Sequence, residues 1–83
     1  MSKYEPLGWY LEMSKKKYVF LTFSEIEEIL GFTLSDYLYK YSVAWVGTAE
    51  KSPTHVLKAV LFDHGYQVDT VDLQAKKVVF FRL

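Results

Sequence analysis

The clearest structural signal in the chain is the stretch TFSEIEEILG at residues 22–31. Thr22 and Glu25 have the spacing of a capping box, in which two side chains satisfy free backbone donors at a helix start. Ser24 and Glu27 have the same spacing, so either Thr22 or Ser24 can be the cap. Gly31 closes the stretch, because glycine adopts the left-handed conformation of a helix end at little cost. The stretch therefore predicts a short, well-delimited helix.

Further helices and strands flank this helix on both sides. The aromatic and β-branched run YVFL at 18–21 predicts a strand directly before it. Further along, Ser52 followed by Pro53 is typical of a helix start, with a cap and then proline in the first turn. The expected order is helix, strand, helix, short helix, helix, strand, strand, at about 4–14, 18–21, 22–31, 34–41, 53–64, 66–73 and 77–83.

Periodicity predicts which faces of these elements are buried. Leu7, Tyr10 and Leu11 have helical spacing and are expected to face the core. The alternation of the first hairpin strand slips near 69–71, which indicates a β-bulge. The helix at 53–64 has a broad apolar face that we expect to be buried, comprising Val56, Leu57, Ala59, Val60 and Leu61.

Together these elements predict a single compact α+β domain over residues 1–83, since a chain of this length does not form a second core. The element order is also that of a winged helix. In that fold the strand at 18–21 would add to the final hairpin, and the helix at 53–64 would be the third helix. The stretch at 32–51 is longer than a winged helix needs, which argues against this reading.

The composition limits the classes of protein to consider. The 83 residues are 51% hydrophobic and 18% aromatic, and ten Lys and Arg balance ten Asp and Glu, which excludes strong disorder. The absence of cysteine excludes disulfides, cysteine-based zinc sites and thiol chemistry, and it fits a reducing compartment. No signal-peptide pattern or membrane-length apolar run occurs. We therefore expect a cytoplasmic protein that contacts no membrane.

The titratable residues favour structural roles over catalysis. Glu25, Glu27 and Glu28 stand at the start of a helix, where capping and the helix dipole explain them. His55 and His64 are too far apart on one helix to converge on a metal. Nucleophile-elbow, phosphate-loop and calcium-loop patterns do not occur. We expect no enzymatic activity, no cofactor and no metal.

A cluster of aromatic residues after the capped helix suggests a binding surface. On a helix, Tyr37 and Tyr41 share one side and Tyr39 lies on the other, so they cannot all be buried. Exposed aromatics commonly anchor protein interfaces, although a small aromatic core explains the cluster equally well. This indicates a non-enzymatic protein-interaction module whose partner is a host protein or a second copy in a homodimer. Its candidate partner-binding residues are Tyr37, Tyr39, Tyr41 and Trp45.

The alternative function is nucleic-acid binding by a winged-helix-like regulator. Residues 23–41 predict helix, turn and helix, and the hairpin tip carries lysines as a wing might. Two observations argue against nucleic-acid binding. The net charge is zero. The helices expected at 35–41 and 53–64, which could enter a DNA groove, lack the Arg, Asn and Gln side chains that read base edges. The candidate phosphate-contacting residues are Lys15, Lys16, Lys17, Lys58, Lys76 and Lys77.

Several of these features occur together in one known family. They are the Phe-x-x-Ile-Glu pattern within 21–31, then Leu34, Trp45, His55, Gly65, Tyr66, Val68, Val71, Asp72, Val78, Val79 and Phe80. With them the chain resembles an uncharacterised family of small bacterial and phage domains, a domain of unknown function. The chain departs from the family's Trp-Trp-x-Asn element, because Ala44 and Gly47 replace the first tryptophan and the asparagine. The resemblance implies a phage or mobile-element protein, and hence an anti-CRISPR-like inhibitor of a host defence protein.

Overall fold

The computed structural model describes residues 2–46 and 55–83 of the chain. Within these ranges, helices and strands follow the expected order, which confirms the α+β class. None of the helices in the two ranges is both long enough and apolar enough to span a bilayer. The elements are α1 (Glu5–Ser14), β1 (Tyr18–Thr22), α2 (Phe23–Leu30), α3 (Asp36–Lys40), the 3₁₀ turn η1 (Ser42–Ala44), α4 (His55–Asp63), β2 (Tyr66–Asp72) and β3 (Lys77–Arg82).

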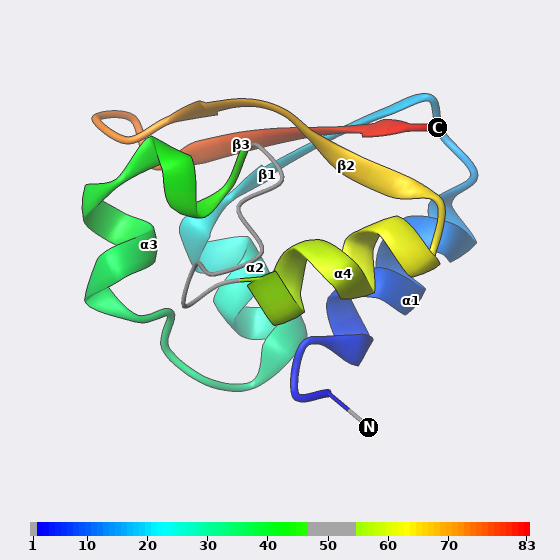
Figure 1. Cartoon of the computed structure of the whole chain (residues 1–83), viewed down its shortest axis with the longest axis horizontal. Helices are drawn as coiled ribbons and strands as arrows, with labels where there is room; N and C mark the ends of the chain where they lie inside the picture. The colour runs from blue at the N-terminus through cyan, green and yellow to red at the C-terminus, as the bar shows by residue number, and fades with distance from the viewer. Residues whose placement is uncertain (1, 47–54) are drawn as a thin grey trace.

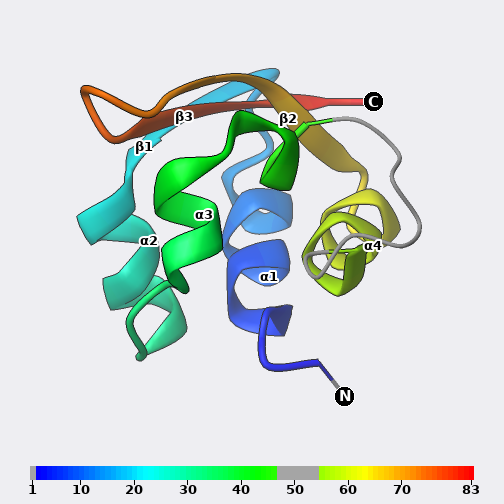
Figure 2. The same cartoon turned by 60° about the vertical axis from the view of Figure 1, so that its left-hand side comes forward.

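The three strands form one antiparallel sheet in the order β1-β3-β2. Strand β1 adds to the final hairpin as predicted, and the register of β2 shifts between Val68 and Thr70, which confirms the expected bulge. The labelled helices lie on one side of the sheet in both views (Figures 1 and 2). The element order and the added strand agree with the winged-helix-like reading. The stretch after α2 contains α3 and η1, which that fold does not need.

Helix α2 begins and ends where its sequence predicts. The Thr22 side chain accepts a hydrogen bond from the Glu25 amide, and the Glu25 carboxylate accepts one from the Thr22 amide at 2.8 Å. Thr22 is therefore the cap, which decides between the two possible capping boxes. Gly31 ends the helix with φ at 82°, in the left-handed region. The position of β1 relative to α2 is thus fixed by one capped turn.

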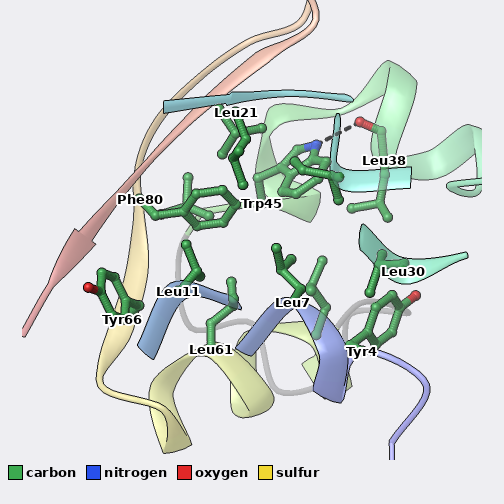
Figure 3. Close-up of a cluster of buried hydrophobic side chains, with 14 of the residues drawn as sticks. Tyr4, Leu7, Leu11, Leu21, Leu30, Leu38, Trp45, Leu61, Tyr66 and Phe80 are labelled. Carbon is green, nitrogen blue, oxygen red and sulfur yellow. Dashed lines mark hydrogen bonds between the residues drawn. The ribbon is translucent and has the colours of Figure 1, made fainter. Parts of the chain in front are cut away.

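The core lies between the inner face of the sheet and the helices (Figure 3). Helix α1 packs against both α2 and α4. Trp45 stacks on Phe23 with ring centroids 5.2 Å apart, and its indole N–H donates to the Leu38 carbonyl oxygen at 2.7 Å. This bond satisfies the one polar atom that the Trp45 side chain brings into the core.

Some expected buried positions are exposed. Tyr10 of α1 faces outward, because the helix packs through Leu7, Gly8 and Leu11 instead. Val56 and Ala59 of α4 are likewise exposed, so the buried face of α4 is narrower than predicted. The helix start expected at Ser52 and Pro53 lies outside the described residues.

Candidate functional site

The four predicted partner-binding aromatics do not form one surface. Tyr37 and Tyr41 lie together, with ring centroids 5.0 Å apart, and Tyr41 is 51% exposed. Trp45 is 2% exposed, so its prediction as a surface anchor is wrong. The physical reason is that the chain leaves the helical conformation at Tyr41, and the following turn directs Trp45 into the core. Only Tyr37 and Tyr41 remain as a shared patch.

Tyr39 has a structural role on the other side of α3. Its hydroxyl donates to Glu27 Oε2 at 2.9 Å, and the Leu34 amide donates to the same oxygen at 2.8 Å. Partial burial raises the pKa of Tyr39, and the hydrogen bond and negative charge of Glu27 raise it further. Glu27 therefore ties α2 to the segment leading into α3, a role that its position in the sequence does not reveal.

The six candidate phosphate-contacting lysines do not gather in one patch either. Thr22 pairs with Lys77, whereas Tyr18, which follows the three lysines at 15–17, pairs with Phe81. The two lysine groups therefore lie at opposite ends of the sheet. Lys58 donates to the Val43 carbonyl oxygen at 2.9 Å, and burial lowers the pKa of Lys58. The continuous basic surface that binds duplex nucleic acid is not formed by these residues.

The outer face of the sheet, which points away from the helices, is apolar where β1 pairs with β3. The neighbouring residues in the strands are buried, so alternation directs Tyr18, Phe20, Val79 and Phe81 outward. Tyr18 lies opposite Phe81 and Phe20 lies opposite Val79 across the two strands. Phe20 is 72% exposed and Tyr18 is 48% exposed. We call these four side chains the aromatic sheet face; polar residues border it, namely Thr22, Gln67, Thr70, Asp72 and Lys77.

This face is unusual because β1 and β3 are apolar on both sides. A strand that is solvated on one face normally alternates apolar and polar residues, whereas continuous apolar runs are typical of strands covered on both faces. In the part of the chain that the structure describes, the helices all lie on one face of this sheet (Figures 1 and 2). An exposed aromatic cluster of this kind marks a site of interaction more often than a solvated surface. It is therefore our candidate functional site.

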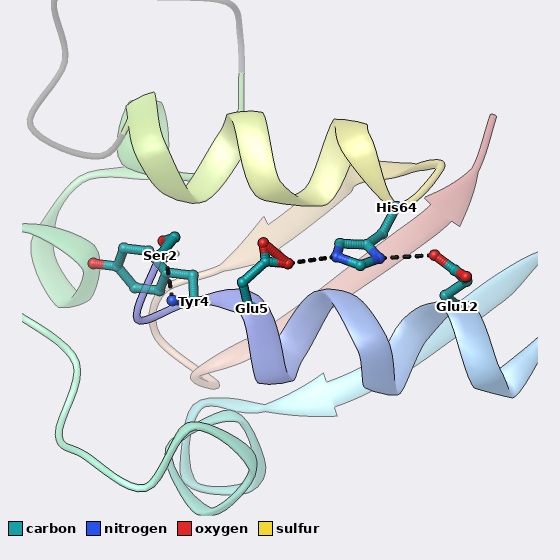
Figure 4. A network of polar contacts seen from close by, with 5 residues as sticks. All are labelled: Ser2, Tyr4, Glu5, Glu12 and His64. Atoms are coloured by element: carbon teal, nitrogen blue, oxygen red, sulfur yellow. Dashed lines mark hydrogen bonds and ion pairs between the residues drawn. The ribbon is translucent and has the colours of Figure 1, made fainter.

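A second polar cluster joins α1 to the end of α4. His64 lies between two carboxylates, with Nε2 2.7 Å from Glu5 Oε1 and Nδ1 2.7 Å from Glu12 Oε1 (Figure 4). Both ring nitrogens must donate to satisfy two acceptors, and only the imidazolium form has two N–H groups. The Trp9 ring meets the imidazole edge to face, with centroids 4.8 Å apart. We call Glu5, Glu12 and His64 the histidine clamp.

The histidine clamp predicts a pH-dependent stability. The hydrogen bond to Glu5 raises the pKa of His64; burial of the ring opposes this, and the hydrogen bond to Glu12 and the two negative charges add to the rise. Because the folded state binds the proton more tightly, its stabilisation is complete below the unfolded pKa of about 6.5 and is lost as pH rises through the folded pKa. The basic side chains Lys15 and Arg82 line the hollow beside His64.

We expect the free energy of unfolding to be higher at mildly acidic pH than at mildly alkaline pH. Urea unfolding curves at the two pH values measure the difference. His64→Gln should abolish most of it, whereas the control His55→Gln, which leaves the clamp intact, should retain it. Equal pH dependence in the wild type and His64→Gln would show that the clamp is not the titrating element.

The clamp does not have the geometry of a metal site. Glu5 and Glu12 contact opposite nitrogens of His64, so the three groups do not converge on one point. Within residues 2–46 and 55–83 there is no group of three or more His, Cys, Asp or Glu residues that could hold a metal ion. No protein-family model, curated protein or solved structure matches the chain. Its function is therefore inferred from its own residues.

Proposed function

We propose that the protein is a non-enzymatic protein-interaction module that binds its partner through the aromatic sheet face. The observation that carries the proposal is Phe20, a phenylalanine that is 72% exposed in the middle of a strand. A lone exposed apolar residue needs no explanation, but Phe20 has Tyr18, Val79 and Phe81 beside it on the same face. The surface is thus assigned to the sheet rather than to Tyr37 and Tyr41.

The composition of the surface supports this assignment. Protein interfaces combine an aromatic centre with a polar rim, and the energetically important residues lie in the centre. Here the centre is formed by the aromatic sheet face, and the rim includes Gln67, Asp72 and Lys77. The strands that carry these side chains belong to the packed sheet, so little order has to be gained on binding.

We propose the class of partner from the residues that carry the resemblance to small bacterial and phage domains. Our proposal is that the module inhibits a host defence protein by covering part of its surface. A small domain with a zero net charge and a preformed aromatic face needs no chemistry of its own for such a role.

Single-stranded nucleic acid is the second candidate ligand. One observation favours it: lysines stand at both ends of the aromatic sheet face, with Lys17 directly before Tyr18 and Lys77 two residues before Val79. Aromatic side chains stack on unpaired bases, and lysines contact the phosphates. Binding of this kind would weaken steeply with added salt, whereas an apolar protein interface would not.

A pull-down from host lysate tests the proposed function. Tagged wild-type protein is compared with the variants Phe20→Ser, Phe62→Ser and Tyr41→Ala, with and without nuclease. Phe62 is the matched control, because it is a phenylalanine 64% exposed on α4. We expect the wild type and Phe62→Ser to capture the same protein after nuclease treatment. Phe20→Ser should capture at least about tenfold less of that protein, as expected for an interface hot spot.

Three other outcomes would each change the assignment. Capture that is unaffected by Phe20→Ser but lost in Tyr41→Ala would place the surface on α3. Capture that disappears with nuclease in the wild type would favour the nucleic-acid candidate. Equal capture by all variants would contradict the use of the aromatic sheet face.

A further inference from the structure

The aromatic sheet face is large enough to associate but too small to bind tightly by itself. An aromatic side chain buries about 150–250 Å² when it is fully covered. With Phe20 at 72% and Tyr18 at 48% exposure, these two side chains offer about 250 Å² in each molecule. Stable interfaces bury about 800 Å² per partner, so the polar rim must also contribute. A complex through this face is expected to be weak and dependent on concentration.

The charges around this face fit a second copy of the same surface. A twofold dimer places one patch against itself, so a rim with one sign of charge would repel. This rim carries both signs, because Asp72 and Lys77 are register partners on neighbouring strands, and its other members Thr22, Gln67 and Thr70 are uncharged. The chain as a whole carries ten charges of each sign, so two copies have no net repulsion.

We propose that the free protein forms a homodimer in which the aromatic sheet faces of two copies pack against each other. The inference rests on the proposed function, because the dimer uses the same aromatic sheet face that we assign to partner binding. In the absence of the partner, a second copy of the protein covers this face. Sheet-on-sheet packing of this kind gives both faces of β1 and β3 the apolar cover that their sequences require. Dimerisation and partner binding then exclude each other, and dilution of the protein favours partner binding.

Sedimentation velocity from micromolar to millimolar concentration tests the dimer. The wild type should move from the 9.7 kDa monomer towards twice that mass as concentration rises. Phe20→Ser should weaken dimerisation by about tenfold or more, as expected for the central residue of an interface. Phe62→Ser should dimerise like the wild type, and circular dichroism should show both variants folded, since both side chains are exposed.

A wild type that stays monomeric at every concentration would overturn the dimer. A dimer that survives Phe20→Ser and is lost in Phe62→Ser would also overturn it, because the contact would then lie on α4. These results are separate from the pull-down. A monomeric wild type whose partner capture still depends on Phe20 would leave the proposed function standing, whereas a Phe20-dependent dimer without any captured partner would support self-association alone.

Discussion

Trp45→Ala is expected to destabilise the fold by about 3–5 kcal/mol, the usual range for removing a buried tryptophan. Trp45 is 2% exposed, stacks on Phe23 and donates its indole N–H to Leu38. The substitution leaves a cavity between α2 and the turn after α3, and it removes the donor that the Leu38 carbonyl faces. Domains of this length have total stabilities of about 4–12 kcal/mol, so a large part of the native population would be lost.

Urea unfolding followed by circular dichroism measures this effect. Tyr41→Ala is the appropriate control, because Tyr41 comes from the same aromatic cluster and is 51% exposed. It should change stability by less than about 0.5 kcal/mol, as surface substitutions usually do. Similar unfolding midpoints for Trp45→Ala and Tyr41→Ala would contradict the placement of Trp45 in the core.

Gly8→Ala is expected to destabilise the protein, although alanine normally stabilises the interior of a helix by about 1 kcal/mol relative to glycine. A Cβ at Gly8 would overlap the His64 ring, lying 2.8 Å from Cγ and closer still to Cδ2. Two carboxylates hold that ring in place, so it cannot move without breaking the clamp. Overpacking of this kind costs about 1–3 kcal/mol.

The double variant with His64→Ala tests the cause. Once the ring is absent, Gly8→Ala should stabilise the protein, because only the helix preference of alanine remains. The effect of one substitution thus changes sign with the residue at position 64, and urea unfolding of the four proteins measures this coupling. Independent, additive effects of the two substitutions would contradict the close packing of Gly8 against His64.

Local signals explain the parts of the fold that the sequence could predict. The cap at Thr22, the left-handed Gly31 and the bulge near Thr70 each depend on residues a few positions apart. The role of Trp45 was not predictable in this way. The backbone leaves the helical conformation at Tyr41, with φ at −127° and ψ at 121°, so helical spacing does not determine where Trp45 points. The direction of Trp45 depends on that one backbone change.

The histidine clamp could not be found from the spacing of residues. Glu5 and Glu12 are 59 and 52 positions from His64, so only the packing of α1 on α4 brings the three together. Gly8 gives a partial signal, since a glycine inside an amphipathic helix often marks a close approach. The tertiary fold determines which side chain approaches Gly8, here His64.

The aromatic sheet face did leave a signal in the sequence. The runs YVFL in β1 and VVFF in β3 are apolar at successive positions, although one face of a small antiparallel sheet is commonly solvated. Such a pattern is typical of strands that are covered on both faces. The tyrosine cluster at 37–41 is visible in the sequence because its residues are two positions apart, whereas Tyr18 and Phe81 become neighbours only when β1 pairs with β3.

Amide NMR spectra of isotope-labelled protein, recorded at increasing concentration, test the central claim most directly. The claim is that the aromatic sheet face is the surface through which this protein associates. It predicts that concentration-dependent shifts concentrate on Tyr18, Phe20, Val79 and Phe81, in β1 and β3. In Phe20→Ser, the shifts of Tyr18, Val79 and Phe81 should require at least about tenfold higher protein concentration. Shifts confined to Tyr37 and the surrounding α3, with β1 and β3 unchanged, would contradict it.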